Sequence, residues 1–145
     1  MDATEQFFIP FGNAGTFAFD REPDPWFIPL LMIICELGWL PLNWDTYDAR
    51  PVDPRTAVFT MKLLLELLSE NDPLPSVVPT SRGGIQLEWH EGGIGLEIDI
   101  RSPSSVDMSI EDGEHDEEFE NIDFETIQDK LYIVRSRLQD TGENA

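Results

Sequence analysis

The residues best suited to chemistry lie on either side of a glycine pair in the middle of the chain. Glu88 and His90 precede Gly92-Gly93, and Glu97 and Asp99 follow it, in each case at alternate positions. In two strands joined by a tight turn, such positions share one face. Carboxylate oxygens suit Ca²⁺, Mg²⁺ or Mn²⁺, and imidazole suits transition metals. The four residues are therefore a candidate divalent-metal site, with hydrolysis as one use for it.

Established metal and nucleophile patterns are missing from the sequence. His90 and His115 are the only histidines, Cys35 is the only cysteine, and the EF-hand spacing is absent. Cys35 lies in an apolar run, where it is expected to be a small core residue. No serine occupies a strand–turn–helix elbow. The sequence therefore predicts no catalytic residue and no cofactor.

A second group of ionisable residues follows the glycine pair as an acidic run. The net charge of the 145-residue chain is −20, which opposes direct binding to nucleic acid or to an anionic membrane surface. Opposite charge would favour a basic protein surface, although the same charge also serves solubility alone. The expected partner-binding carboxylates are Glu111, Asp112, Glu114, Asp116, Glu117, Glu118 and Glu120. Glu88, Glu97 and Asp99 on the outer side of the predicted hairpin come second.

Two aromatic residues are further candidates for partner binding. Trp44 and Tyr47 lie in the stretch 42–52, which has neither helix nor strand periodicity and is predicted to be an ordered loop. Aromatic side chains anchor protein interfaces. They also fill the cores of small domains. Trp44 and Tyr47 are therefore candidates for both roles.

A β-hairpin over residues 80–100 is predicted to position the metal candidates. A two-residue Gly-Gly turn would align Leu87 with Ile98 on a buried face and Glu88 with Glu97 on the opposite face. Directly opposed like charges are unfavourable in a sheet. The pair Glu88 and Glu97 is therefore solvated, matched by a nearby arginine, or kept for a ligand. Alternation over 106–110 predicts a third antiparallel strand.

Three helices are expected around these strands. Residues 26–37 form a buried helix or a buried strand, because periodicity alone does not separate the two. Asp53 caps a helix that begins at Pro54 and runs to Ser69. The final helix is expected over 124–139. The predicted core stripe of the second helix is Val58, Met61, Leu65 and Leu68, and Leu64 and Phe59 are expected to widen it.

We predict a single α+β domain over residues 1–145. Its centre is a three-stranded or slightly larger antiparallel meander with two to three helices packed on one face. Strands near residues 7–10 and 16–19 could extend the sheet, whereas 71–79 is expected to be a stiff connector, 111–122 an acidic loop and 141–145 a frayed tail. With one cysteine, no basic residue before Arg21 and no apolar run of about 20 residues, we expect a cytoplasmic protein.

Two stretches resemble a widespread group of small uncharacterised bacterial proteins. The first is Trp44-Asp45-Thr46-Tyr47-Asp48-Ala49-Arg50-Pro51, and the second is Gly83-Gly84-Ile85-Gln86-Leu87-Glu88-Trp89. Members tend to carry a Trp-Asp-Gly-Tyr-Gly-Ala-type stretch about forty residues before a Gly-Gly-x-x-Leu-Glu-Trp hairpin. Here Thr46 and Asp48 replace the two glycines of the first motif. The resemblance implies a bacterial or phage setting and no established activity.

The expected function is that of a non-enzymatic, acidic protein-binding domain. We expect an inhibitor of the immunity, antitoxin or anti-defence type that occupies a basic surface of a partner protein, such as a nucleic-acid-binding surface. The alternative is a divalent-metal-binding domain that uses Glu88, His90, Glu97 and Asp99. The sequence leaves open whether the chain forms a homo-oligomer.

Overall fold

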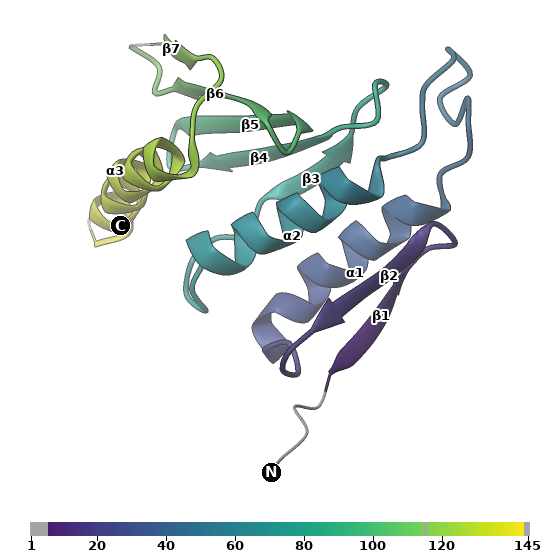
Figure 1. The fold of residues 1–145 in the computed structure, drawn as a ribbon. Helices are drawn as coiled ribbons and strands as arrows, with labels where there is room; N and C mark the ends of the chain where they lie inside the picture. The colour runs from purple at the N-terminus through teal and green to yellow at the C-terminus, as the bar shows by residue number, and fades with distance from the viewer. Residues whose placement is uncertain (1–5, 115, 144–145) are drawn as a thin grey trace.

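The computed structural model describes residues 6–114 and 116–143, and within them it contains three α-helices and two antiparallel sheets (Figure 1). The α+β class is confirmed. The larger sheet has five strands in the order β3-β4-β5-β6-β7, so the predicted three-stranded meander is its centre and not its full extent.

The central strands follow the predicted pairing. They are β4 (Ile85–Glu91), β5 (Ile94–Ser102) and β6 (Ser105–Glu111). Leu87 lies opposite Ile98 and Glu88 lies opposite Glu97, as the Gly-Gly turn predicts. The alternation of apolar and polar residues and the Gly-Gly turn together therefore set the register.

Two outer strands were not predicted. β3 (Ser76–Pro79) lies in the expected connector, and β7 (Asp116–Phe119) lies in the expected acidic loop. Both are edge strands, where proline and charged side chains are tolerated and discourage pairing with other chains. The proline of β3 and the carboxylates of β7 therefore make these two segments look like loops in the sequence.

The helix predicted from the Asp53 cap begins at Pro54 as expected, and the segment 26–37 is helical and not a strand. α1 (Ile28–Glu36) lies between two short 3₁₀ turns, η1 (Pro25–Phe27) and η2 (Leu37–Trp39). α2 spans Pro54–Leu67, and the Asp53 carboxylate accepts a hydrogen bond from the Arg55 N–H at 2.9 Å. α3 spans Phe124–Glu143, so it includes three residues of the expected frayed tail, and residues 144–145 lie outside the described chain.

The N-terminal strands form a separate hairpin. β1 (Phe7–Phe11) pairs with β2 (Gly15–Phe19) and does not extend the larger sheet, which corrects that expectation. Its loop packs against η2 with almost no space between the two backbones. A Cβ atom placed on Gly38 would lie 2.2 Å from the Phe11 carbonyl oxygen. Glycine at position 38 therefore lets the hairpin dock.

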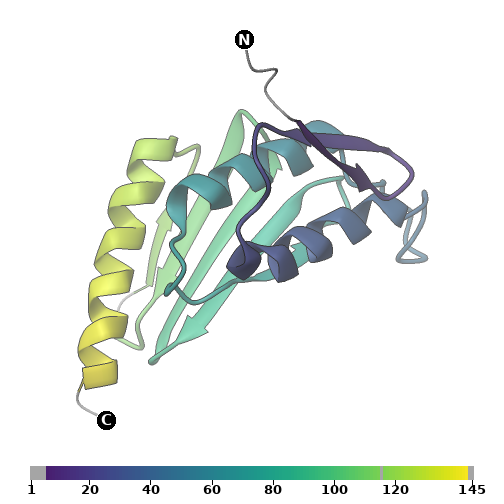
Figure 2. The ribbon, with the colours of Figure 1, turned by 90° about the horizontal axis from the view of Figure 1, so that it is seen from below.

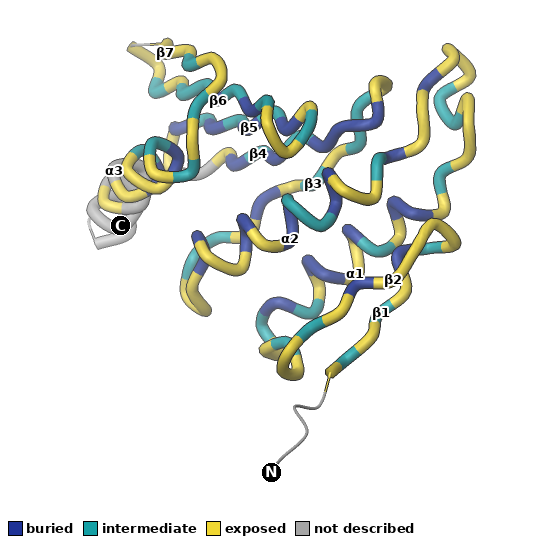
Figure 3. The backbone as a smooth tube through the Cα atoms, in the orientation of Figure 1, coloured by how far each residue is buried: buried dark blue, intermediate teal, exposed yellow. Residues whose placement is uncertain are grey.

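The elements form layers that leave one face of the five-stranded sheet uncovered (Figures 1 and 2). α2 lies across the other face and contacts β4 and β5, while α3 lies next to α2 at the β7 side. α1 and the β1–β2 hairpin lie beyond α2 (Figure 1). Along β5 the residues alternate between buried and half-buried, so the uncovered face carries the polar set (Figure 3).

The predicted core stripe of α2 is only partly buried. Met61 and Leu68 are buried, but Val58 is half-buried and Leu65 is 38% exposed. Of the two residues expected to widen the stripe, Leu64 is fully buried and Phe59 is half-buried, and the helix also turns Ala57 to the core. None of the helices in the described part of the chain is long and apolar enough to cross a membrane.

Candidate functional site

The uncovered face of the five-stranded sheet is the candidate functional site, and we call it the outer face. It is formed by alternate residues of all five strands, because cross-strand partners share one side of a sheet. No described helix lies over it (Figures 1 and 2). Its charged and polar members are Ser76, Gln86, Glu88, His90, Glu97, Asp99, Arg101, Asp107, Ser109, Glu111, Asp116 and Glu118.

Negative charge dominates the outer face. Seven of these side chains are carboxylates, and Arg101 is the one arginine or lysine among them. The strand registers place six carboxylates in three directly opposed pairs: Glu88 with Glu97, Asp99 with Asp107, and Glu111 with Asp116. Opposed like charges weaken a sheet, so this arrangement is costly wherever no cation neutralises it.

Arg101 neutralises one carboxylate of this face. Its two terminal nitrogens contact the two carboxylate oxygens of Asp107 at 2.8 and 2.9 Å. The Arg101 Nε donates to the Ser105 hydroxyl at 3.1 Å, and the Asn121 N–H donates to Asp107 at 3.0 Å. This two-point ion pair is the stronger kind of charge-assisted contact. It holds the β5–β6 turn together.

The opposed pair Glu88 and Glu97 has no such partner. The Gln86 side-chain amide donates to Glu88 at 2.8 Å, and His90 Nε2 lies 3.7 Å from the other Glu88 oxygen. Among the described residues, neither carboxylate has a lysine or arginine within ion-pair distance. The expectation of a matching arginine is therefore not met, and solvation or a ligand remains.

Asp99 carries the clearest electrostatic signature on the outer face. Partial burial raises the pKa of its carboxyl above the ordinary value, and the neighbouring Asp107 raises it further, whereas Arg101 acts in the opposite direction. The folded state therefore disfavours the charged form of Asp99. A cation brought next to it would reverse that effect.

The four metal candidates share the outer face, as predicted, but they are not gathered into one cluster. Glu88, His90, Glu97 and Asp99 come from adjacent positions of β4 and β5. Across the described residues, no three or more His, Cys, Asp or Glu side chains are grouped so that they could hold a metal ion. Their spacing suits a spread-out charged surface better than a coordination shell.

The predicted partner-binding carboxylates divide into three locations. Glu111, Asp116 and Glu118 lie on the outer face through the pairing of β6 with β7. Glu117 pairs with Ile110, so its side chain points to the other side of the sheet, where it is exposed because β7 is an edge strand. The remaining three lie in the turns on either side of β7: Asp112, Glu114 and Glu120. His115 lies outside the described residues.

Trp44 and Tyr47 are not part of the outer face. They lie in the loop before α2, at the far side of the molecule from β7 (Figure 1). The Trp44 indole N–H donates to the Arg50 carbonyl oxygen at 2.8 Å, which closes the loop. Tyr47 is 85% exposed at its tip. Trp44 is thus half-buried against its own loop, whereas the expectation that Tyr47 packs onto the domain as a core residue is wrong.

The same loop holds three residues in the left-handed region of backbone space. Their φ angles are 63° at Asn43, 66° at Thr46 and 65° at Asp48. Asparagine and aspartate tolerate this region, but a β-branched residue such as threonine is strained there. Glycine would adopt these angles freely.

Two members of the outer face were missed by sequence reasoning. Asp107 and Arg101 are recognised only when the register is continued from β5 into β6, where Asp107 faces Asp99. The alternation of Val106, Met108 and Ile110 with Asp107 was a sufficient signal for this placement.

No protein-family model, no curated protein and no solved structure matches the chain.

Proposed function

We propose that the chain is a non-enzymatic protein-binding domain whose outer face occupies a basic surface of a partner protein. The observation that carries this proposal is the uncovered sheet face with seven carboxylates and one arginine. Under this proposal the protein is an inhibitor of the immunity, antitoxin or anti-defence type, in a bacterial or phage setting. The partner surface is one that otherwise receives nucleic acid.

The spacing of the carboxylates supports a nucleic-acid-binding surface as the target. Alternate residues of a strand are about 6.7 Å apart, and neighbouring strands are about 4.8 Å apart. The carboxylates of β4 to β7 thus form a rigid grid of negative charge. Each strand of a DNA duplex carries one negative charge per about 3.4 Å along the helix axis. A groove lined with Lys and Arg for a polyanion would also attract such a grid.

The opposed carboxylate pairs also support binding over solubility alone. Solubility requires negative charge somewhere on the surface, but it does not require carboxylates to face each other across strands. Those pairs reduce the stability of the free domain. Lysine or arginine side chains of a partner placed between these carboxylates would remove the repulsion. Part of the binding free energy would then come from the loss of repulsion within this domain.

The test compares two variants with the same net charge. In the face variant, Glu88, Glu97, Glu111 and Glu118 are changed to Gln, and in the control variant four exposed carboxylates away from the outer face, Glu22, Glu36, Glu66 and Asp129, are changed to the corresponding amides. Each tagged protein captures partners from nuclease-treated host extract at low salt and then at high salt. Electrostatic association should weaken as salt rises.

We expect the wild type and the control variant to retain the same basic protein at low salt and to release it at high salt, while the face variant retains little of it. Equal retention by the two variants would show that net charge, and not this face, governs binding. Loss of binding only after substitution of Tyr47, with salt having no effect, would move the interface to the loop before α2. Capture of no protein by any form contradicts the proposal.

A further inference from the structure

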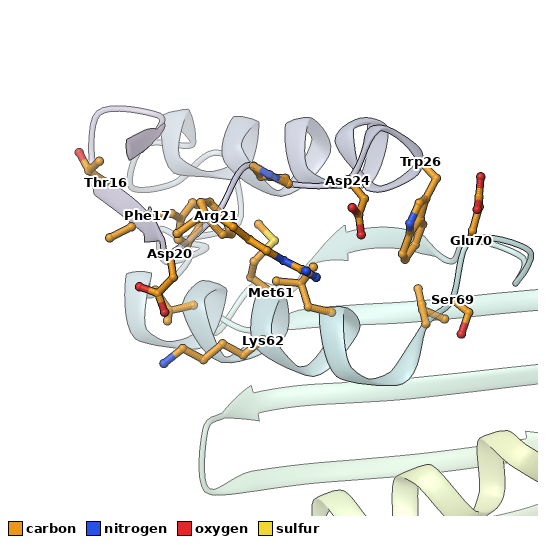
Figure 4. Close-up of a pocket in the computed structure, with 16 residues that line it drawn as sticks. Thr16, Phe17, Asp20, Arg21, Asp24, Trp26, Met61, Lys62, Ser69 and Glu70 are labelled. Carbon is orange, nitrogen blue, oxygen red and sulfur yellow. The ribbon is translucent and has the colours of Figure 1, made fainter. Parts of the chain in front are cut away.

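A cavity of about 600 Å³ lies between the N-terminal hairpin and α2, on the other side of the sheet from the outer face. Its walls come from β2, from the connector 20–26 and from one side of α2 (Figure 4). This volume is within the range of small-molecule sites. The apolar side chains that line it are Phe17, Phe19, Trp26, Val58, Met61, Leu65 and Leu68.

The cavity explains why the predicted core stripe of α2 is not fully buried. Val58, Met61, Leu65 and Leu68 follow helical spacing along one side of the helix, and all four line the cavity. The core is filled from another side of the same helix, including Leu64, which is fully buried. Leu65 remains 38% exposed in the cavity wall. An apolar helix side next to a hollow is a surface that a bound apolar group would cover.

Two cations border this apolar surface without an ion-pair partner. Arg21 and Lys62 both line the cavity, and neither forms an ion pair with any described residue. In Figure 4 the Arg21 side chain extends over the cavity toward its middle. Its guanidinium is therefore available to a ligand.

The other charged groups at the cavity restrict where an anion could sit. Asp20 lies at the same end as Lys62 in Figure 4, whereas Asp24 and Glu70 lie at the end near Trp26. Both ends thus carry carboxylates that repel a second negative charge. Arg21, between them, is the cation that a single carboxylate group could approach with its two oxygens.

We propose that this cavity binds an amphipathic organic carboxylate of the fatty-acid type. The apolar chain covers the stripe from Val58 to Leu68, and the carboxylate accepts hydrogen bonds from Arg21. This site is independent of the proposed function, because it uses no residue of the outer face. One of the two can therefore be wrong while the other holds.

The test uses decanoate and decan-1-ol, below the concentration at which decanoate forms micelles. The two probes share an apolar chain and differ in the head group. Binding is measured by isothermal titration calorimetry and by the shift in melting temperature, which a ligand of the folded state raises. The variants are Arg21→Gln and, as a matched charge control, Arg82→Gln, since Arg82 is exposed and does not line the cavity.

We expect one decanoate per chain, with binding at least tenfold weaker in Arg21→Gln and unchanged in Arg82→Gln. Decan-1-ol should bind the wild type more weakly than decanoate and should be insensitive to Arg21→Gln. Leu65→Glu, at a partly exposed position that the fold tolerates, should abolish binding of both probes. The proposal is overturned if the wild type does not bind decanoate, if the two arginine variants weaken it equally, or if the alcohol binds as tightly as the acid.

Discussion

Two carboxylates that face each other across β5 and β6 should respond in opposite ways to the same chemical change. Asp99→Asn and Asp107→Asn each remove one negative charge from the same cross-strand pair. Asp99 is partly buried, and the pKa of its carboxyl is raised, so its charged form is disfavoured in the fold. Asp107 is held by Arg101 at 2.8 Å and accepts a further bond from the Asn121 N–H at 3.0 Å. We expect the first variant to be more stable than the wild type and the second to be less stable.

The magnitudes follow from these contacts. Removal of one directly opposed like charge is worth about 0.5 kcal/mol, within the range for cross-strand pairs. Asp107→Asn gains the same relief but loses an ion pair with a partly exposed arginine, which costs about 1 kcal/mol after allowance for solvent screening. The variants should therefore differ by about 1 kcal/mol in their free energies of unfolding. For a chain of this size the difference in melting temperature is about 2–4 °C.

Urea unfolding at several pH values provides the assay. A raised folded-state pKa means that the native protein binds more protons than the unfolded chain, so ionisation of Asp99 lowers stability as pH rises. The advantage of Asp99→Asn is then full at neutral pH, shrinks as pH falls through the raised pKa, and is lost below the ordinary value of 3.8. The reasoning is refuted if Asp99→Asn is less stable than the wild type at pH 7, or if the two variants change stability equally.

Three further changes test the packing elsewhere in the chain. Gly38→Ala should destabilise the fold by about 2–4 kcal/mol, because its Cβ would meet the Phe11 carbonyl oxygen at 2.2 Å; an unchanged urea midpoint would contradict the close docking of the hairpin. Thr46→Gly should raise the free energy of unfolding by about 1 kcal/mol, because the φ of 66° strains a β-branched residue. Thr46→Ala keeps a Cβ and should raise it much less. Equal increases in the two variants would exclude strain as the cause. Burial raises the pKa of the Cys35 thiol to about 11, so alkylation by iodoacetamide at pH 8 should be much slower in the folded protein than in urea, and equal rates would contradict that environment.

The sequence predicts the central hairpin well because two local signals agree there. Alternation sets which residues face the core, and the Gly-Gly turn sets the register, so Glu88 is correctly placed opposite Glu97. β3 and β7 carry no comparable signal. β3 ends in a proline, and three of the four residues of β7 are carboxylates. Both segments become strands because a neighbouring strand offers hydrogen bonds. The pairing of β3 with β4 and of β7 with β6 depends on the neighbouring strand, so the residues of β3 and β7 alone do not predict it.

The side of α2 that faces the core was also not predictable from its pattern. The helix carries apolar residues over a wide arc, so that both Leu64 and Leu65 fit a core position. Helical periodicity identifies the arc but not which part of it meets the sheet. The structure buries Leu64 completely and leaves Leu65 at the cavity. The choice depends on where α1 and the N-terminal hairpin dock, which the residues of α2 alone do not specify.

The location of the candidate site shows how charge along a chain differs from charge in space. The acidic run gathers carboxylates in sequence, but strand alternation and the turns distribute them, so Glu117 and Glu118 lie on opposite sides of β7. The outer face instead gathers carboxylates from four strands, among them Asp99 and Asp107, whose neighbours in sequence are largely apolar. Repulsion within this face is a cost that the free domain bears at all times. If Asp99→Asn proves more stable and the amide variant of the same face loses the basic partner, stability and binding are opposed on one face, as expected of a surface shaped for a cationic partner.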